Sequence, residues 1–585
     1  MSSRTHKCYG GIEMRRLSIT APHLQGMRAG QMPSRPIHPE DVIFSHLEPL
    51  HDTKMRREMS VVVGDGGAGD GGKAKHVDAI GGRFLETSPV PPTDFKPASG
   101  PGDGHCVVGQ FSNVYKQVPA LLGRPGARGH LLGLGLANGY SVAGSVIAPD
   151  MFFMEMRNFI ERLGGAPLAG RLTVSPKCGI LLPAHRALNR MIEAMRLDSF
   201  SSTGEGVGEM WRDILGLDLD PAHAFDWILQ STATKTTPVL TVADLFDLSA
   251  ARKKLEQILA AKKALAMQLG GIYSVHYNAE YFDVAAQMDK LAAWQAGFRQ
   301  FVNCDKAGQF YADPAFVRHL IEIHAPRIYE LSQGMLLHRL WGYWPRGGRK
   351  LCGPDAVMAT TGLSREEIGH VAMVIRLYRT DHGKRSVPTE VFGSQYDVMR
   401  DNVGASPFAG HFRVGWLDLR ALEYAIELAQ PDSLVIGNID RMKHLPIIKF
   451  GVGYHWHGTE DRLMELAAAA GKELAIRGRA PQLETFYTDR LSRPGAIEDC
   501  GNGKLRLNVF VPVEEILKDV EPIYAYFDGC SNQHASFAGI RQLDDLTGPL
   551  SAFRDALLYV ENFTGVPLSA VSTGEMAEDT FLVRV

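Results

Sequence analysis

The feature that most restricts the fold is the stretch VVVGDGGAGDGGKAKHVD, residues 61–78, in which three valines lead straight into a glycine-rich loop with carboxylates and lysines. A short apolar run is consistent with a buried strand. Glycines let backbone N–H groups approach and point at phosphate oxygens. The stretch therefore predicts a strand that ends in a phosphate-binding loop, although it lacks the GK[ST] ending of the usual phosphate loop. A glycine-rich hairpin or linker is the alternative.

Strand-like and helical segments alternate along the rest of the chain. Short apolar runs such as GRLTVSP, RIYELSQG, HVAMVIRLY, DSLVIGNID and PIIKFGVGY are consistent with buried strands, whereas MFFMEMRNFIERL and LDLRALEYAIELA have helical spacing. The alternation predicts an α/β fold with a large, mostly parallel central sheet flanked by helices, in which ligands bind beyond the carboxyl ends of the strands. We expect helical insertions at about 207–325 and at 457–500, the latter polar and on the surface.

Composition excludes several classes of function. The formal net charge of −3 argues against a protein that coats nucleic acid, because displacing counterions needs a basic surface. No window approaches the ~18 uninterrupted apolar residues of a membrane span, and the N-terminus lacks the apolar region of a secretory signal. The seven dispersed cysteines form no CxxC pair, which is typical of reduced thiols in a cytoplasmic protein.

Residues 1–58 differ from the rest of the chain. They are rich in arginine, proline, glycine and histidine and have no sustained apolar period. We expect a flexible N-terminal extension, or a translation start placed before Met59, with a transit peptide as a further alternative. The catalytic domain is expected to occupy residues 59–585.

Asp70 is the unusual member of the glycine-rich loop. Lys73 can place an ammonium group on phosphates, but a carboxylate repels them unless a cation lies between, or unless the carboxylate handles a proton. Magnesium ligation combined with general-base work satisfies both conditions. Asp70 is therefore a candidate metal ligand and base.

Several segments occur in the order found in one enzyme family. Residues 69–78 follow the pattern G-D-x-G-K-x-K-x-V-D, and SSTGEGVG, LTVADLFD, YELSQGMLL, YRTDHGKRSVPTE, RVGWLDLRALEYAIEL, VEPIY and TGVPLSAVSTG follow it along most of residues 59–585. Together they resemble the adenylosuccinate synthetase family, whose fold is related to the P-loop NTPases. That family uses GTP and Mg²⁺ to phosphorylate the 6-oxygen of IMP, and aspartate then displaces the phosphate. The resemblance also implies a homodimer.

The resemblance assigns roles to individual residues. Asp70 matches the family aspartate that binds magnesium and takes the N1 proton of the purine, beside a phosphate loop formed by Gly69, Gly72 and Lys73. Phosphoryl transfer needs mainly positioning and charge neutralisation, which this set can supply. The residues that match acceptor-binding positions are Ser202, Thr203 and Gln333.

The nucleotide base has its own predicted pocket. The family reads guanine with a Lys-x-Asp that follows a strand, and SLVIGNID supplies Asn438 and Asp440 at these places. Retention of the aspartate favours GTP, and loss of the lysine leaves ATP as an alternative. Ser572 and Gly574 match the family segment that lines the base, but Glu575 replaces its proline.

The first departure from the family lies in the loop that carries its catalytic histidine. The family sequence GHNAGH reads GDGHCVVGQF here, so that histidine falls near Gly109 or Gln110. His105 is a candidate replacement if the loop shifts; otherwise it is a solvent-facing or core histidine. By resemblance, Gly109 is expected to approach the nucleotide and the metal.

The amine and acceptor sites depart further. The family TTGRxRR, which binds aspartate, reads SPFAGHFR, in which Arg413 survives with His411 nearby. Bidentate recognition of a carboxylate by arginine is not replaced by glycine or phenylalanine. Asp381 replaces another arginine and is expected to favour a basic or neutral amine. Lys235 is the nearest substitute for the arginine that the partner subunit supplies in the family. The basic run that replaces TYPYVTSSN is a phosphate site or a solvated loop (Arg346, Arg349 and Lys350).

Three functions are compatible with this pattern. The first is a GTP- or ATP-dependent C–N ligase with a changed acceptor or amine, because specificity lies in contacts to the part of the substrate that varies. The second is a nucleotide-binding sensor that no longer ligates. The third is a phosphotransferase that stops after the first step.

Overall fold

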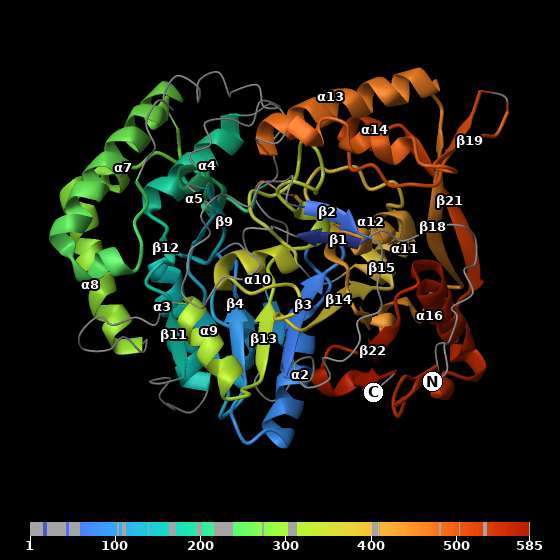
Figure 1. Ribbon diagram of the computed structural model, residues 1–585, viewed down its shortest axis with the longest axis horizontal. Helices are drawn as coiled ribbons and strands as arrows, with labels where there is room; N and C mark the ends of the chain where they lie inside the picture. Colours follow the sequence, from blue (N-terminus) through green and yellow to red (C-terminus); the bar gives the residue numbers. More distant parts are fainter. Residues whose placement is uncertain are drawn as a thin grey trace.

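The computed structural model describes residues 16–19, 42–45, 59–101, 105–107, 113–137, 140–162, 171–195, 202–215, 238–271, 274–301, 313–400, 408, 410–478, 481–501, 503–530 and 535–583. Within these residues, two large sheets lie among helices, with most of the long helices on the outside of the molecule (Figure 1).

A nine-stranded sheet forms the centre. In sheet order its strands are β11 (Leu172–Val174), β7 (Arg128–Leu131), β4 (Thr93–Lys96), β13 (Arg327–Glu330), β3 (Ser60–Asp65), β14 (His370–Arg376), β17 (Ser433–Gly437), β22 (Leu568–Ser572) and β23 (Thr580–Leu582). Neighbouring strands are parallel except β22 and β23, which are antiparallel. This arrangement confirms the predicted α/β fold with a mostly parallel sheet.

The valines of residues 61–63 form β3, in the middle of this sheet. Val61 pairs with Ile328 on one side and with His370 on the other. Val62 and Val63 are fully buried, as expected for a parallel strand that is covered on both faces. The glycine-rich loop therefore begins at the carboxyl end of a central strand.

A second, six-stranded sheet was not anticipated from the sequence. It contains β15 (Tyr378–His382), β16 (Phe412–Asp418), β18 (Ile447–Trp456), β20 (Leu505–Leu507) and β19 (Ile497–Asp499) in that order, with β21 (Val520–Asp528) paired to β18. Most of these pairs are antiparallel. Strand β15 follows β14 after one residue, so the chain passes directly from the carboxyl edge of the central sheet into the second sheet.

Four pairs of short strands complete the β-structure: β1 (Arg16–Ile19) with β2 (Val42–Ser45), β5 (His105–Val107) with β6 (Asn113–Tyr115), β8 (Gly135–Ala137) with β9 (Tyr140–Ala143), and β10 (Val146–Ile147) with β12 (Gly179–Ile180). The first pair lies in the N-terminal extension.

The α-helices are α2 (Lys73–Thr87), α3 (Pro149–Arg162), α4 (Pro183–Met195), α5 (Val207–Leu215), α7 (Leu248–Gln268), α8 (Val284–Phe301), α9 (Asp313–Glu322), α10 (Pro354–Thr361), α11 (Ser394–Met399), α12 (Leu419–Ala429), α13 (Glu460–Gly478), α14 (Phe486–Leu491), α15 (Glu514–Leu517) and α16 (Ser551–Thr564). Helices α7 and α8 pack together at one side of the molecule (Figure 1). No helix of the described part is long and apolar enough to cross a membrane.

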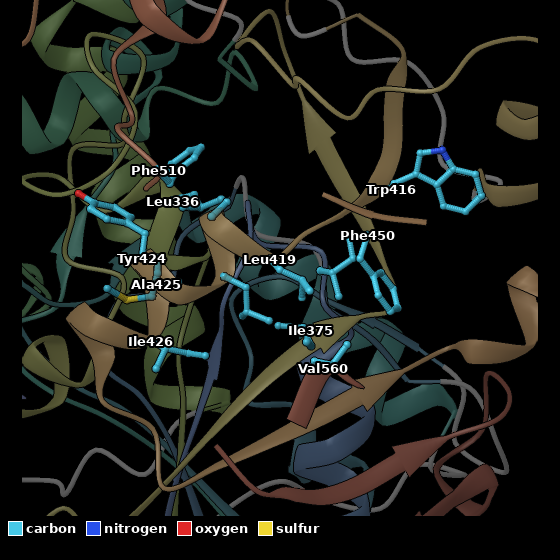
Figure 2. Packing of buried hydrophobic residues seen from close by; sticks show 14 of the residues in the cluster. Leu336, Ile375, Trp416, Leu419, Tyr424, Ala425, Ile426, Phe450, Phe510 and Val560 are labelled. Carbon is cyan, nitrogen blue, oxygen red and sulfur yellow. The ribbon is translucent and has the colours of Figure 1, made fainter. Parts of the chain in front are cut away.

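The largest apolar core joins the two sheets. Helix α12 begins where the Asp418 carboxylate accepts a hydrogen bond from Ala421 N at 3.1 Å, and its apolar face then packs between the sheets. Figure 2 shows this packing among Leu419, Tyr424 and Ile426 of α12, Ile375 of β14, Phe450 of β18 and Val560 of α16. Burying each such side chain stabilises the fold by about 1.5–3 kcal/mol.

The 457–500 segment takes part in this core. Leu463, Ala467, Ala470 and Leu474 of α13 are buried, because their spacing of four, three and four residues places them on one helical face. The segment contains α13 and α14 and contributes buried side chains to the core, so it is not a purely polar surface layer.

Candidate active site

The glycine-rich loop, residues 66–72, connects β3 to α2 and folds around the carboxylate of Asp65. Asp65 Oδ1 accepts hydrogen bonds from Gly67 N at 2.7 Å and Gly69 N at 3.3 Å, and Oδ2 accepts one from Gly71 N at 2.5 Å. A Cβ atom at position 71 would lie 2.6 Å from Asp65 Oδ2, so only glycine lets the loop close so tightly. Sequence analysis missed Asp65, which orders the loop from within.

Lys73 points back into this loop. Its Nζ donates to Gly69 O at 2.7 Å and lies 3.4 Å from Asp65 Oδ2, and the side chain is buried. Gly72, at the N-cap of α2, has a φ of 90° and no side chain to cap the helix. The first amide groups of α2 can therefore take an anion, with Lys73 beside them.

Asp70 lies at the mouth of the loop beside His382, the last residue of β15. Asp70 Oδ2 and His382 Nε2 are 3.2 Å apart, and both side chains are partly buried. Burial acts to raise the pKa of Asp70, but His382, Arg376 and Lys73 outweigh it and lower this pKa below its usual range. Burial acts to lower the pKa of His382, and the Asp70 carboxylate outweighs it and raises this pKa. Sequence analysis missed His382, since its partner is more than 300 residues away.

The predicted base pocket is held together by Lys75, a residue of the glycine-loop motif that had no assigned role. Its buried Nζ donates to Asn438 Oδ1 at 2.6 Å, to Ser572 Oγ at 2.5 Å and to Gly574 O at 2.7 Å. The structure thus brings together three of the four predicted base-binding residues. Burial, with the charge of Arg376, lowers the pKa of Lys75 to about 7.

Asp440, the fourth of these residues, lies two positions beyond Asn438, which itself has a φ of 53°. Asp440 Oδ1 is buried, and no described group hydrogen-bonds to it. Burial raises the pKa of Asp440, although Arg441 and Lys75 oppose this shift. A buried carboxylate oxygen without a partner can accept from a ring N–H and an exocyclic amino group.

The predicted acceptor residues lie in two places, one beside the glycine-rich loop and the other just before α5. Gln333 adopts a φ of 61° and touches the phosphate loop: a Cβ at Gly69 would lie 3.2 Å from Gln333 Cα. Ser202 Oγ donates to Asn189 Oδ1 at 3.3 Å, and Thr203 is exposed. Both precede α5, whose first turn lies beside Arg349, since Arg349 Nη1 donates to Gly208 O at 2.9 Å.

The other members of the predicted basic run are placed differently. Lys350 is buried and its Nζ donates to Ala98 O at 2.8 Å, so this residue is not part of a solvated loop. Arg346 has interactions within the protein.

The amine-site candidates differ in their surroundings. Arg413 forms a bidentate ion pair with Glu390, and its Nη1 donates to Gly383 O and Arg385 O. His411 is exposed. The guanidinium of Arg413 therefore holds the turn after β15 in this structure.

Asp381 does not present a charge to a basic amine, contrary to expectation. It is fully buried, its carboxylate forms an ion pair with Arg385, and Arg379 Nη2 lies 3.4 Å from it. Two guanidinium groups neutralise the charge that was expected to select the amine.

The remaining candidates are placed only in part or not at all. His105 begins β5, where it pairs with Tyr115, beside α2. Gly109, Gln110 and Lys235 lie outside the described residues.

The donor set fits magnesium that is shared with a bound phosphate. The described residues contain no group of three or more histidine, cysteine or acidic side chains arranged for a metal ion. Mg²⁺ usually takes one or two carboxylates together with substrate phosphates and water. Asp70, beside a phosphate loop, can supply that carboxylate.

A glycine loop at the carboxyl end of a central parallel strand, with a carboxylate in the loop, is typical of α/β proteins that bind ligands beyond the carboxyl ends of their strands. Comparison with known proteins identifies the family. The profile described as adenylosuccinate synthetase matches residues 61–486, and the chain belongs to this family.

Individual relatives are distant. The chain is 24% identical to the adenylosuccinate synthetase of Proteus mirabilis over 75% of the chain and 82% of that protein. It is 25% identical to the enzyme of Solibacter usitatus over 88% of the chain and 95% of that protein. The solved structure of fully ligated adenylosuccinate synthetase from Plasmodium falciparum has the same fold, with a TM-score of 0.66 and 16% identity over 89% of this chain and 99% of that one. The predicted family and fold are thus confirmed.

Proposed function

We propose that the protein is an NTP-dependent C–N ligase that phosphorylates the carbonyl oxygen of an IMP-like purine nucleotide and lets an amine displace the phosphate. The observation that carries this proposal is the position of Asp70 at the mouth of the phosphate loop, 3.2 Å from His382 and close to Lys73 and Arg376. A carboxylate in this position can both hold Mg²⁺ beside the phosphates and take a proton from an acceptor, which are the two tasks that the ligase reaction requires of it.

The reaction has two steps. Asp70 accepts the ring N–H proton of the acceptor, and the neighbouring carbonyl oxygen attacks the γ-phosphorus as the bond to the β-phosphate oxygen breaks. The amine then attacks the phosphorylated carbon, and inorganic phosphate leaves with the C–O bonding electrons. Asp70, together with phosphate oxygens, would hold Mg²⁺, which would neutralise charge on the phosphates.

GTP is the proposed donor. The unpartnered Oδ1 of Asp440 suits guanine, which offers N1–H and a 2-amino group, whereas adenine offers no donor at N1. Asn438 in place of the family lysine keeps ATP as the alternative donor.

The amine site supports a substrate other than aspartate, although aspartate is the first amine to test. Arg413, the arginine retained from the family pattern, is engaged by Glu390 and by two backbone carbonyls. We expect it to shape the turn at residues 383–385, and we expect the amine to be recognised mainly by other groups.

Phosphate release with GTP or ATP, measured against a panel of purine nucleotides and amines, tests the proposal. Release that requires both an acceptor and an amine supports the ligase. Transfer of phosphate to the acceptor without an amine would indicate a phosphotransferase. Tight GTP binding without turnover for any pair would indicate a nucleotide sensor and would overturn the proposal.

Replacing Asp70 by Asn separates chemistry from binding. The amide cannot take the acceptor proton, so we expect turnover to fall by about 10²–10⁴-fold. Binding of the acceptor and of nucleotide without metal, measured by calorimetry, should change little. Turnover near that of the wild type would contradict the mechanism.

A further inference from the structure

One pair of side chains at the site has a geometry that the reaction does not by itself require. His382 Nε2 approaches Asp70 Oδ2 to 3.2 Å. We infer that His382 is a positioning residue: its Nε2 lies at ion-pair distance from Asp70 Oδ2, without the alignment of a hydrogen bond in this structure, and it thereby turns Oδ1 toward the side on which Mg²⁺ and the acceptor N–H would lie. This role rests on the proposed function for the identity of the acceptor, but the pairing itself does not.

The position of His382 is fixed from three sides. Its backbone is paired with Phe412 across the β15–β16 ladder. Its ring packs edge-on against Phe412, with centroids 4.8 Å apart. Its carbonyl accepts a hydrogen bond from Arg385, which also pairs with the buried Asp381. An imidazole held in this way can hold a carboxylate in turn.

The other cations that act on Asp70 are engaged elsewhere. Lys73 Nζ donates to Gly69 O at 2.7 Å, and Arg376 Nη1 donates to the Tyr378 hydroxyl at 2.6 Å. Of these three residues in the described part of the chain, His382 is the one that forms an ion pair with the Asp70 carboxylate, at 3.2 Å. The orientation of Asp70 therefore depends on His382 more than on either neighbour.

The two members of the Asp70–His382 pair come from different elements. Asp70 comes from the loop after β3, and His382 comes from the end of β15 in the second sheet. The pair thus spans the junction of the two sheets at the mouth of the phosphate loop. Because the loop itself offers Asp70 no side-chain partner within hydrogen-bonding distance in the described residues, the second sheet sets the direction of the predicted base.

Four variants test this role: His382→Ala, His382→Gln, Asp70→Asn and, as control, His457→Ala. His457 Nε2 lies 3.1 Å from the exposed Glu521, so it forms a histidine–carboxylate pair away from the site. Glutamine retains an N–H donor near the Nε2 position and carries no charge. Thermal unfolding of each variant establishes that it is folded.

The first measurement is Mn²⁺ affinity by electron paramagnetic resonance, in parallel samples with GTP and with ATP. We expect His382→Ala to weaken Mn²⁺ binding by about 10–100-fold, the usual effect of removing a partner of a metal ligand. His382→Gln should restore most of the affinity, and His457→Ala should leave it unchanged. Asp70→Asn removes the predicted metal-binding carboxylate itself, so it sets the lowest Mn²⁺ affinity expected in the series.

The second measurement is turnover, in which kcat should follow Mn²⁺ affinity while KM for the acceptor stays constant. Wild-type Mn²⁺ affinity in His382→Ala would overturn the inference. So would equal loss of turnover in the Gln and Ala variants with unchanged metal affinity, because His382 would then contact the transferred group directly. Absence of turnover in the wild type would overturn the proposed function alone, since the Mn²⁺ series still reports the His382–Asp70 pair.

Discussion

A single ammonium group, that of Lys75, joins the three segments of the predicted base pocket. Its pKa of about 7 lies below the ordinary value of 10.5, chiefly because the group is buried. Below pH 7 both the folded and the unfolded chain hold this proton. Between about pH 7 and 10.5 the unfolded chain binds a proton that the folded chain lacks, so stability contributed by this group rises with pH in that window.

Replacing Lys75 by Met should remove this dependence. We expect the Tm of the wild type to rise relative to the Tm of Lys75→Met as the pH increases above about 7. Below about pH 7 the difference between the two Tm values should be constant. Differential scanning calorimetry at a series of pH values measures both. A Tm difference that stays constant across the whole range would show that Lys75 keeps its proton in the folded protein.

For individual residues, the sequence indicated which polar side chains belong to the site better than it indicated which side chains contact them. The motif around Asp70 and the segments holding Asn438 and Ser572 were recognisable because each has a local pattern. Asp65 and His382 were missed, because the role of each depends on where a glycine loop or a distant strand places its partners. The ion pairs of Asp381 and Arg413 likewise follow from the β15–β16 pairing and from no local signal.

The glycine-rich loop is the element whose order depends most on one side chain. Asn at position 65 would turn an NH₂ group toward backbone N–H donors, leaving at least one donor of Gly67, Gly69 or Gly71 unpaired at a cost of about 1–3 kcal/mol. We therefore expect Asp65→Asn to speed hydrogen exchange of the loop amides and to lower Tm. The matched control is Asp499→Asn, whose carboxylate accepts from Gly501 N at 2.7 Å in an exposed turn. Equal exchange rates in Asp65→Asn and wild type would contradict this role.

Element prediction succeeded for the parallel strands and failed for the second sheet. DSLVIGNID and HVAMVIRLY became β17 and β14 of the central sheet, as continuous apolar runs predict. PIIKFGVGY became β18, which pairs mostly with antiparallel partners in the second sheet. An apolar run shows that a strand is buried, but it does not show which sheet contains the strand.

The whole molecule is organised by two sheets that both begin after residue 58. Every strand of the central sheet and of the second sheet lies between Ser60 and Leu582, whereas β1 and β2 form a separate two-stranded sheet among the described strands. We therefore expect the chain 59–585 to fold with the Tm of the full chain and to bind GTP with the same affinity. Light scattering should also show for it the homodimer that the family resemblance implies for the full chain. A lower Tm with unchanged nucleotide affinity would show that the β1–β2 pair stabilises the core through α12, the helix that β1 approaches.

Loss of the dimer alone would assign residues 1–58 to the subunit interface. Either result would contradict the expectation that residues 1–58 are dispensable.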